Sequence, residues 1–194
     1  MDYMSRESLL DDFLPHNAIC AEIGVWRGAF AKEIWHRTNP KELHLVDPWV
    51  DLPTDYITTD GNAIASPGDV LNFDNLKTVF WMFIEQIRQG RVMIHPGFSH
   101  IVSNLFRDEY FDWVYIDAIH EYKYVLEDLR CWSPKVKRNG FIAGHDFCVG
   151  VRGKVVAAVR EFCEESDWKL LHITDIQEGG PEGSDVASYV LSCC

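Results

Sequence analysis

The chain has 194 residues, of which 47% are hydrophobic and 25% charged, and its 18 Lys and Arg against 30 Asp and Glu residues give a formal net charge of −12. This length and composition predict one compact domain over residues 1–194 and exclude a disordered or low-complexity chain. The acidity argues against broad binding to nucleic acid or to anionic membranes, and the sequence lacks the run of about 20 apolar residues that a membrane helix needs.

The N-terminal residues and the cysteines indicate the compartment. Residues 1–17 carry acidic groups and lack the basic flank and apolar centre of a signal peptide, so we expect a cytoplasmic protein. Six cysteines without a C-x-x-C pair disfavour a zinc knuckle and a disulfide-rich scaffold, and we expect most of them to be buried thiols. Residues 8–14 are apolar and acidic and could pack against a second subunit, which would make the protein a homo-oligomer.

Short apolar runs rich in Val, Ile and aromatic residues alternate along the chain with helical patterns. This order predicts an α/β fold with a mostly parallel sheet, and the nearly continuous apolar character of the central runs indicates strands covered on both faces. The seven predicted strands cover residues 18–25, 43–47, 91–95, 112–117, 141–145, 168–174 and 186–193.

Three stretches with helical spacing lie between these strands, at residues 76–87, 122–129 and 155–163, and we expect each helix to pack on the sheet. The connections are too short to divide the chain into two domains. Residues 50–74 are the exception, because they are long and turn-rich where an α/β protein usually has a short connection. Two interpretations of this segment stay open: a lid over a ligand, or an ordinary surface loop.

The first predicted strand leads into the pattern Glu22-x-Gly24-x-x-x-Gly28. Ligands of open parallel sheets bind at the carboxyl ends of the strands, where Gly24 would permit a tight turn and Gly28 a close approach of the next helix. The pattern differs from the G-x-G-x-x-G turn that holds a pyrophosphate, since it has one fewer glycine and begins with an acid. A carboxylate at this place repels phosphate and favours an amino group or hydroxyl donors.

Asp47 ends the second predicted strand, about 20 residues beyond the glycine turn, where such folds place an acid that accepts hydrogen bonds from ribose hydroxyls. An isolated Asp would be interpreted as a turn former, but together with the glycine turn it favours a nucleoside site. After the third strand, Gly97, Phe98 and Ser99 offer an aromatic ring and a hydroxyl for an adenine, although Phe98 could equally belong to the core.

Four polar side chains, Asp117, His120, His145 and Asp146, follow the fourth and fifth predicted strands and should meet at one edge of the sheet. Two carboxylates with imidazoles match the ligands of a divalent metal, and His120 could act as a general base beside it. Hydrogen-bonded turn caps that bind nothing are the alternative. The sequence has no G-x-S-x-G elbow, P-loop or H-E-x-x-H motif, which disfavours hydrolases and kinases.

From residue 22 to about residue 162 the chain resembles the class I S-adenosylmethionine-dependent methyltransferases. It is most similar to the metal-dependent O-methyltransferase branch with macrocin and mycinamicin O-methyltransferases and cephalosporin-hydroxylase-like proteins, and catechol O-methyltransferase is a more distant relative. The similarity is carried by the order D-x-x-H, D-L, W-x-P, N-G and G-H-D in the run FDWVYIDAIHEYKYVLEDLRCWSPKVKRNGFIAGHDF, followed by Gly150-Val151 and residues 157–159.

The resemblance implies a Rossmann-like, doubly wound, seven-stranded sheet that is mostly parallel with an antiparallel last strand, and S-adenosylmethionine bound over the glycine turn. It also implies a magnesium or manganese ion and a small-molecule acceptor with a hydroxyl group. The implied cofactor-binding residues are Glu22 for the methionine end, Gly24 and Gly28 for the turn, Asp47 for the ribose, Gly97, Phe98 and Ser99 for the adenine, and Asp117. The implied metal ligands are Asp117, His145 and Asp146, and the implied catalytic residues are His120 and Asp117.

The implied reaction is methyl transfer to a hydroxyl whose pKa the metal lowers and whose proton His120 accepts, with alignment as the main contribution of the protein. The chain departs from its relatives at His145, where an acid is common, and at Phe147, where catechol-type enzymes have Asn. Three alternatives stay open: a nicotinamide-dependent oxidoreductase, a non-catalytic nucleoside-binding protein and a metal-dependent hydroxylase-like enzyme.

Overall fold

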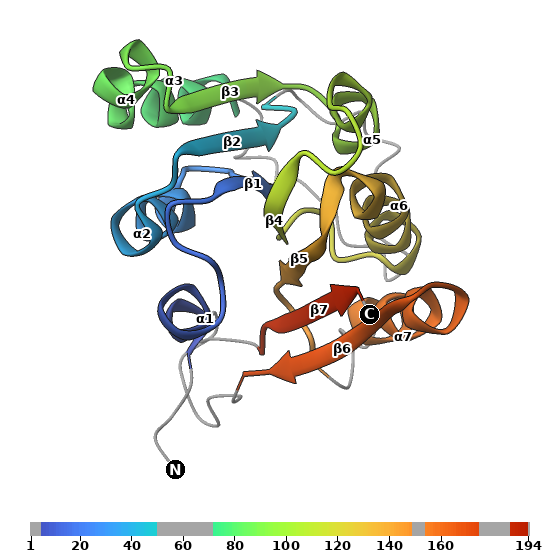
Figure 1. Ribbon diagram of the computed structural model, residues 1–194. Coiled ribbons are helices and arrows are strands. Elements are labelled where there is room, and N and C mark those ends of the chain that lie inside the picture. The colour runs from blue at the N-terminus through green and yellow to red at the C-terminus, as the bar shows by residue number, and fades with distance from the viewer. Residues whose placement is uncertain (1–4, 50–71, 149–153, 175–186, 194) are drawn as a thin grey trace.

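The computed structural model describes residues 5–49, 72–148, 154–174 and 187–193, which form a seven-stranded sheet with helices on both faces (Figure 1). The strand order is β3-β2-β1-β4-β5-β7-β6, and all pairs are parallel except those of β7, which runs antiparallel to β5 and β6. The predicted doubly wound fold with an antiparallel last strand is therefore confirmed. The strands are β1 (Ile19–Ile23), β2 (Glu42–Asp47), β3 (Val92–Pro96), β4 (Phe111–Ile116), β5 (Val136–Gly144), β6 (Trp168–Ile173) and β7 (Tyr189–Cys193).

The helices cover the sheet in two layers, with α1 to α4 against one face and α5 to α7 against the other (Figure 1). No helix of the described residues is long and apolar enough to cross a membrane. The helices are α1 (Arg6–Asp12), α2 (Ala29–Thr38), α3 (Asn72–Met82), α4 (Ile84–Arg88), α5 (Ser99–Val102), α6 (Tyr122–Trp132) and α7 (Lys154–Glu165), with short 3-10 turns η1 (Ser103–Leu105) and η2 (Ser133–Lys135).

Alternate residues of the strands point into these two layers, as the pleat of a strand requires. In β4, Trp113 and Tyr115 pack with α1 and α2, whereas Val114 and Ile116 pack with α6 and α7, and all four are buried. This double burial explains why the central strands have a nearly continuous apolar sequence.

The strand order reverses between β1 and β4, because β2 and β3 extend the sheet from β1 in one direction and β5 extends it from β4 in the other. The carboxyl ends of β1 and β4 lie side by side, since Ile23 is in register with Ile116 and the N–H of Asp117 donates to the carbonyl of Ile23 at 2.8 Å. In sheets of this kind such a switch point is where ligands bind. The fold therefore places the glycine turn and Asp117 at the expected position.

Helix α1 was not among the predicted elements, and it changes the interpretation of residues 8–14. Ser5 caps the helix through the backbone N–H of Ser8, and the Ser8 hydroxyl accepts from the N–H of Ser5 in return. Leu9, Leu10 and Leu14 are buried in the core of the same chain. These leucines are therefore covered within one chain, and a homo-oligomer stays a prediction.

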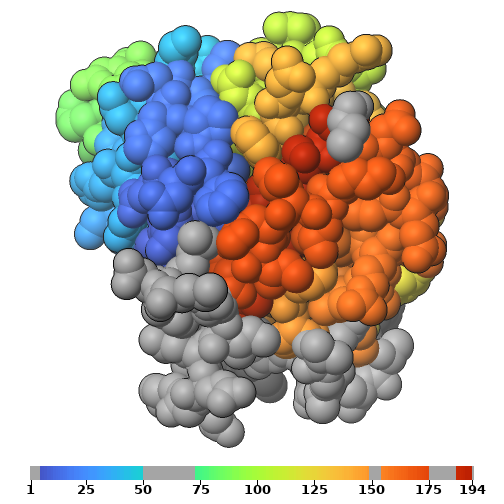
Figure 2. Space-filling view, turned by 60° about the horizontal axis from the view of Figure 1, so that its bottom comes forward, coloured from blue at the N-terminus to red at the C-terminus, as the bar shows by residue number. Residues whose placement is uncertain are grey.

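Figure 2 shows the N-terminal residues, in blue, directly against the C-terminal part of the chain, in orange. The rings of Phe13, just after α1, and His172, in β6, are stacked with centroids 4.4 Å apart. Helix α1 thus lies between α2 and the last strands of the sheet, and it carries its first residues toward the switch point.

Several boundaries differ from the prediction. The helix expected over residues 76–87 is divided into α3 and α4 by Phe83, whose backbone is not helical, and β5 begins five residues early, at Val136. The proposed lid over residues 50–74 falls outside the described residues, except that residues 72–74 form the first turn of α3. Of the five described cysteines, only Cys20 is fully buried, so the expectation of mostly buried thiols is wrong.

Candidate active site

The turn after β1 packs directly on the chain that leaves β4. Gly24 has a φ of +89°, and a Cβ there would lie 2.2 Å from the carbonyl oxygen of Asp117 and 2.6 Å from the Cα of Ala118. Only glycine combines this left-handed backbone with such a close approach. Gly28, with a φ of +78°, begins α2, and a Cβ there would lie 3.0 Å from a methyl group of Val79 in α3. Both predicted reasons for a glycine are present.

Asp47, at the end of β2, holds the glycine turn in shape. Its Oδ2 accepts hydrogen bonds from the N–H groups of Val25 and Trp26, both at 2.9 Å, and its Oδ1 accepts from the N–H of Trp49 at 2.8 Å. Burial raises the pKa of Asp47 even though these three donors oppose the rise. A carboxylate has about four lone-pair positions, so this one can still accept from a ribose hydroxyl.

Glu22 lies in β1 on the face covered by α1 and α2, and only 1% of its surface is exposed. It is in register with Tyr115 of β4, whose ring packs on Phe30 of α2 with centroids 4.4 Å apart. Burial, and secondarily the charge of Asp117, raise the pKa of Glu22 well above its ordinary value, while the charge of Arg6 lowers it. The predicted acid at the head of the glycine turn is thus a buried carboxyl group.

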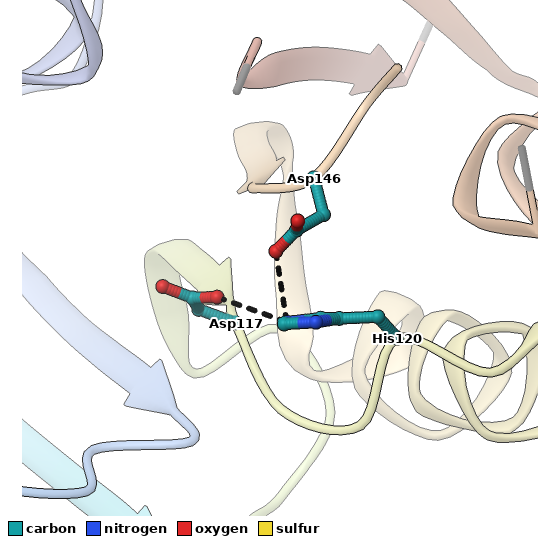
Figure 3. A group of neighbouring side chains, drawn as sticks. All are labelled: Asp117, His120 and Asp146. Carbon is teal, nitrogen blue, oxygen red and sulfur yellow. Dashed lines mark hydrogen bonds and ion pairs between the residues drawn. The ribbon is translucent and has the colours of Figure 1, made fainter. Parts of the chain in front are cut away.

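Three side chains from the ends of β4 and β5 converge beside this turn (Figure 3). Asp117 follows β4, His120 precedes α6, and Asp146 follows β5, and both carboxylates face the His120 ring. The Nε2 atom of His120 is 2.9 Å from Oδ2 of Asp146 and 3.3 Å from Oδ1 of Asp117. Asp146 takes a left-handed backbone, with a φ of +57°, which is uncommon for a residue with a side chain.

The electrostatics of this group keep both carboxylates ionised and the imidazole protonated. Burial alone would raise the pKa of Asp117, but the hydrogen bond from His120 and the charge of Arg6 outweigh it and hold the pKa at about 2. Burial likewise lowers the pKa of His120, but its hydrogen bonds to the two carboxylates raise it to about 9. The pKa of Asp146 is lowered for the same reason, against the effect of burial. At neutral pH the imidazolium therefore balances part of the negative charge.

The same group fits a divalent cation. One ligand atom from each of Asp117, His120 and Asp146 lies within 4.8 Å of the other two. Two carboxylates and an imidazole are a donor set that manganese or iron accepts readily and that magnesium accepts through its oxygens. A cation bound there would compete with the proton of His120 for the same two carboxylates.

His145 does not join this group, although the sequence placed it among the metal ligands. Its Nδ1 is 3.0 Å from the hydroxyl oxygen of Ser188, which also lies 3.0 Å from the hydroxyl oxygen of Tyr115. The positive charge of His145 still lowers the pKa of Asp117 and Asp146. Of the two histidines expected at this edge of the sheet, His120 therefore contacts the two carboxylates and His145 contacts Ser188.

The segment expected to hold an adenine links β3 to α5. Its Phe98 is partly buried and its ring is stacked on that of His100 at 6.2 Å. The Ser99 hydroxyl accepts from Nε1 of Trp132 at 2.7 Å and is hydrogen-bonded to Asp128, both in α6. Burial raises the pKa of Asp128 to about 7, while that hydrogen bond lowers it. Ser99 therefore ties α5 to α6. The parts of this segment still expected to contact an adenine are the ring of Phe98 and the backbone of Gly97.

Sequence reasoning missed Arg6, which reaches the site from α1. Its Nη2 atom donates to Oδ2 of Asp117 at 2.9 Å, and its guanidinium lies 3.7 Å from the ring centre of Phe30. The capping pair Ser5 and Ser8 before two leucines could have predicted the helix, but nothing in the sequence joins residues 111 positions apart. Ser188, which lies between His145 and Tyr115, was missed for the same reason.

Residues 21–147 match the model of a protein family described as a methyltransferase domain. This match covers well over half of the chain and includes every predicted site residue. Comparison with curated protein sequences finds no match.

Many solved structures share the fold. A candidate methyltransferase from Streptococcus mutans in complex with S-adenosylhomocysteine has 12% identity and a TM-score of 0.64, and the similarity covers 100% of both chains. The tRNA methyltransferase TrmK of Bacillus subtilis has 11% identity and a TM-score of 0.61 over 98% of this chain and 67% of its own. Spermidine synthase from Thermotoga maritima has 14% identity and a TM-score of 0.57 over 95% of this chain and 55% of its own.

Proposed function

The chain belongs to the family of class I S-adenosylmethionine-dependent methyltransferase domains, and we propose that it transfers the methyl group to a hydroxyl of a small-molecule acceptor. The observation that carries this proposal is the group formed by Asp117, His120 and Asp146 beside the glycine turn. Methyl transfer to oxygen requires a group that takes the hydroxyl proton and a site that aligns oxygen with the methyl group. An imidazole between two carboxylates at the switch point supplies the first of these needs.

We propose that the cofactor lies over the glycine turn, with its methionine end toward Glu22 and its ribose at Asp47. The unused lone pairs of Asp47 support the second assignment, because three backbone donors leave room for a ribose hydroxyl. For the adenine we propose the ring of Phe98 and the backbone of Gly97, while the hydroxyl of Ser99 positions this segment against α6.

His120 is the proposed base. The side chain of His120 is 44% exposed, so an acceptor hydroxyl can reach it, whereas the side chain of Asp146 is buried. With a pKa raised to about 9, the ring is mostly protonated at neutral pH and accepts a proton only in the fraction that has lost its own. Whatever reduces the negative charge of the two carboxylates therefore makes His120 a better base near neutrality.

Asp117 and Asp146 are the proposed ligands of a magnesium or manganese ion, which would leave His120 free as the base. When bound, such an ion lowers the pKa of a nearby hydroxyl. The geometry does not support His145 as the third ligand, because its Nδ1 lies against Ser188. Relatives commonly have an acid at this position, and the histidine found here contacts Ser188 instead of joining the two aspartates.

The acceptor we propose is a small neutral or cationic molecule rather than RNA. TrmK acts on tRNA, but a nucleic-acid substrate requires lysines and arginines against the phosphates. This chain has 18 such residues against 30 acidic ones, and its site carries Glu22, Asp117 and Asp146. A phosphate backbone would be repelled there.

The test combines binding and turnover for the wild type and for His120→Ala and Asp117→Asn. We expect S-adenosylhomocysteine to stabilise the wild type in a thermal shift assay, since a ligand at 100 times its Kd contributes about 2.7 kcal/mol. His120→Ala should lower the rate of transfer to catechol or sugar hydroxyls by about 100-fold or more, because a positioned base contributes about that much. Its Kd for S-adenosylhomocysteine should change less than about threefold.

His36→Ala is the matched control, because His36 is an exposed histidine of α2, which carries no member of the catalytic group. Full activity in His120→Ala would refute the role of the base. Stabilisation by NAD but not by S-adenosylhomocysteine would refute methyl transfer and favour an oxidoreductase. Transfer to a tRNA transcript without transfer to small hydroxyl compounds would refute the proposed acceptor.

A further inference from the structure

Arg6 brings a positive charge from α1 to the proposed cofactor site. Its guanidinium is held on two aromatic rings, 3.7 Å from the centre of Phe30 and 5.3 Å from that of Tyr115. One of its NH groups donates to Asp117, and its charge also acts on Glu22. Arg6 therefore interacts with both carboxyl groups expected around the methionine end of the cofactor.

Two buried polar atoms at this place have no hydrogen-bond partner in the described part of the chain. They are Nε of Arg6, a donor, and Oε2 of Glu22, an acceptor. The other such atom, the hydroxyl of Tyr189, lies elsewhere, against Gly144 of the neighbouring β5. Buried polar groups are nearly always hydrogen-bonded, so an unsatisfied donor and an unsatisfied acceptor on two residues whose charges interact indicate a missing ligand.

The two unsatisfied atoms are complementary to one chemical group. A carboxylate would accept from Nε and the remaining NH groups of Arg6, which has five N–H donors in a fork that matches a carboxylate. An ammonium would donate to Glu22 and Asp117. The α-amino-acid end of S-adenosylmethionine carries both groups on one carbon atom, so it can satisfy both sides at once.

We propose that Arg6 binds the carboxylate of the amino-acid end of the cofactor, and that α1 thereby selects cofactors that keep this carboxylate. The inference rests on the proposed function, since it names a further binding residue for the same cofactor. Exposure agrees with the arrangement: the side chains of Arg6 and Asp117 retain 15% and 18% of their surface, whereas Glu22 retains 1%. The ligand meets Arg6 and Asp117 first, and Glu22 stands behind them.

The charges of these side chains also support binding of the cofactor carboxylate by Arg6. Arg6 forms an ion pair with Asp117, and its charge also opposes the rise that burial causes in the pKa of Glu22. Without Arg6 the two carboxyl groups would repel the carboxylate of the cofactor.

Isothermal titration with two ligands tests the proposal. S-adenosylhomocysteine carries the carboxylate, and its decarboxylated analogue keeps the adenosine and the amino group but lacks it. We expect wild type to bind S-adenosylhomocysteine about 10- to 100-fold more tightly than the analogue, as a charge-assisted hydrogen bond predicts. Arg6→Gln should remove this preference, by weakening S-adenosylhomocysteine and leaving the analogue within about threefold. Arg6→Lys, which keeps the charge but not the fork, should retain part of it.

Arg37→Gln is the matched control, because Arg37 ties α1 to α2 through Asp11 and Glu33 without reaching the site. It should leave the preference unchanged. Arg6→Gln could loosen α1 for purely structural reasons, but that would weaken both ligands equally, and such a result would overturn the proposal. Tighter binding of S-adenosylhomocysteine to Arg6→Gln would also overturn it, because Arg6 would then compete with the cofactor.

The outcome separates this inference from the proposed function. If wild type binds both ligands with the same affinity, Arg6 does not recognise the carboxylate, while methyl transfer stands. If wild type binds neither ligand, both proposals are wrong.

Discussion

Replacing Gly24 by alanine should force apart the two loops that form the candidate site. The left-handed backbone at Gly24, with a φ of +89°, costs an L-residue about 1–2 kcal/mol. The new methyl group would also lie 2.2 Å from the carbonyl oxygen of Asp117, and overpacking of this kind costs about 1–3 kcal/mol. Because backbone atoms cannot rotate aside, we expect the upper part of both ranges, a loss of about 3–5 kcal/mol in the free energy of unfolding.

Gly90 provides the matched control, since its φ is +69° and a Cβ there would meet nothing within 4 Å. Gly90→Ala should therefore lose only about 1 kcal/mol, the backbone strain less the gain from a stiffer unfolded chain. Urea unfolding followed by circular dichroism measures both variants, and titration with S-adenosylhomocysteine should show binding by Gly90→Ala but not by Gly24→Ala. Equal losses of stability, or wild-type binding by Gly24→Ala, would refute the close approach as the reason for this glycine.

Two further predictions concern stability. His44 is buried in β2, and burial lowers its pKa to about 4 from an ordinary 6.5, so the unfolded chain binds more protons between these values and stability falls as the pH drops. At about 1.4 kcal/mol per pH unit, the free energy of unfolding should fall by about 3 kcal/mol from pH 7 to pH 4. Urea titrations should show a flatter pH profile in His44→Gln. An unchanged profile would contradict the assignment of this loss to His44. Leu9→Ala should cost about 2–5 kcal/mol because Leu9 is fully buried in the core. Leu105→Ala, at a side chain that is 72% exposed, should change stability by less than about 0.5 kcal/mol. Thermal unfolding at two protein concentrations measures both variants.

Much of the fold could be predicted because the central strands are buried on both faces. Val114 and Ile116 face one helical layer and Trp113 and Tyr115 the other, so the whole of β4 must be apolar, and such a run is recognisable in any context. The boundaries of the helices and strands were harder to predict. Phe83 is buried as the helical stripe requires, yet the backbone leaves the helix there, which an apolar pattern cannot reveal.

Parts of the site followed from spacing alone. Gly24 and Gly28 were predicted to need a tight turn and a close approach, and the structure shows both, against Asp117 and Val79. Asp47 lies next to the turn as expected, and its carboxylate accepts from three backbone N–H groups. The turn could be predicted because its conformation depends on a few neighbouring residues, whereas its partners Asp117 and Val79 lie far away in the sequence.

The amino-acid sequence by itself determined the α/β class, the glycine turn and the edge of the sheet at which the polar residues gather, since strand and turn chemistry act over a few residues. Tertiary structure alone decided which of them meet. His145 lies against Ser188, 43 positions away, whereas His120 lies beside Asp117 and Asp146. Arg6 reaches Asp117 across 111 positions because α1 buries its leucines between α2 and the last strands. Contacts of that range depend on the packing of the whole chain, for which no local pattern is a substitute.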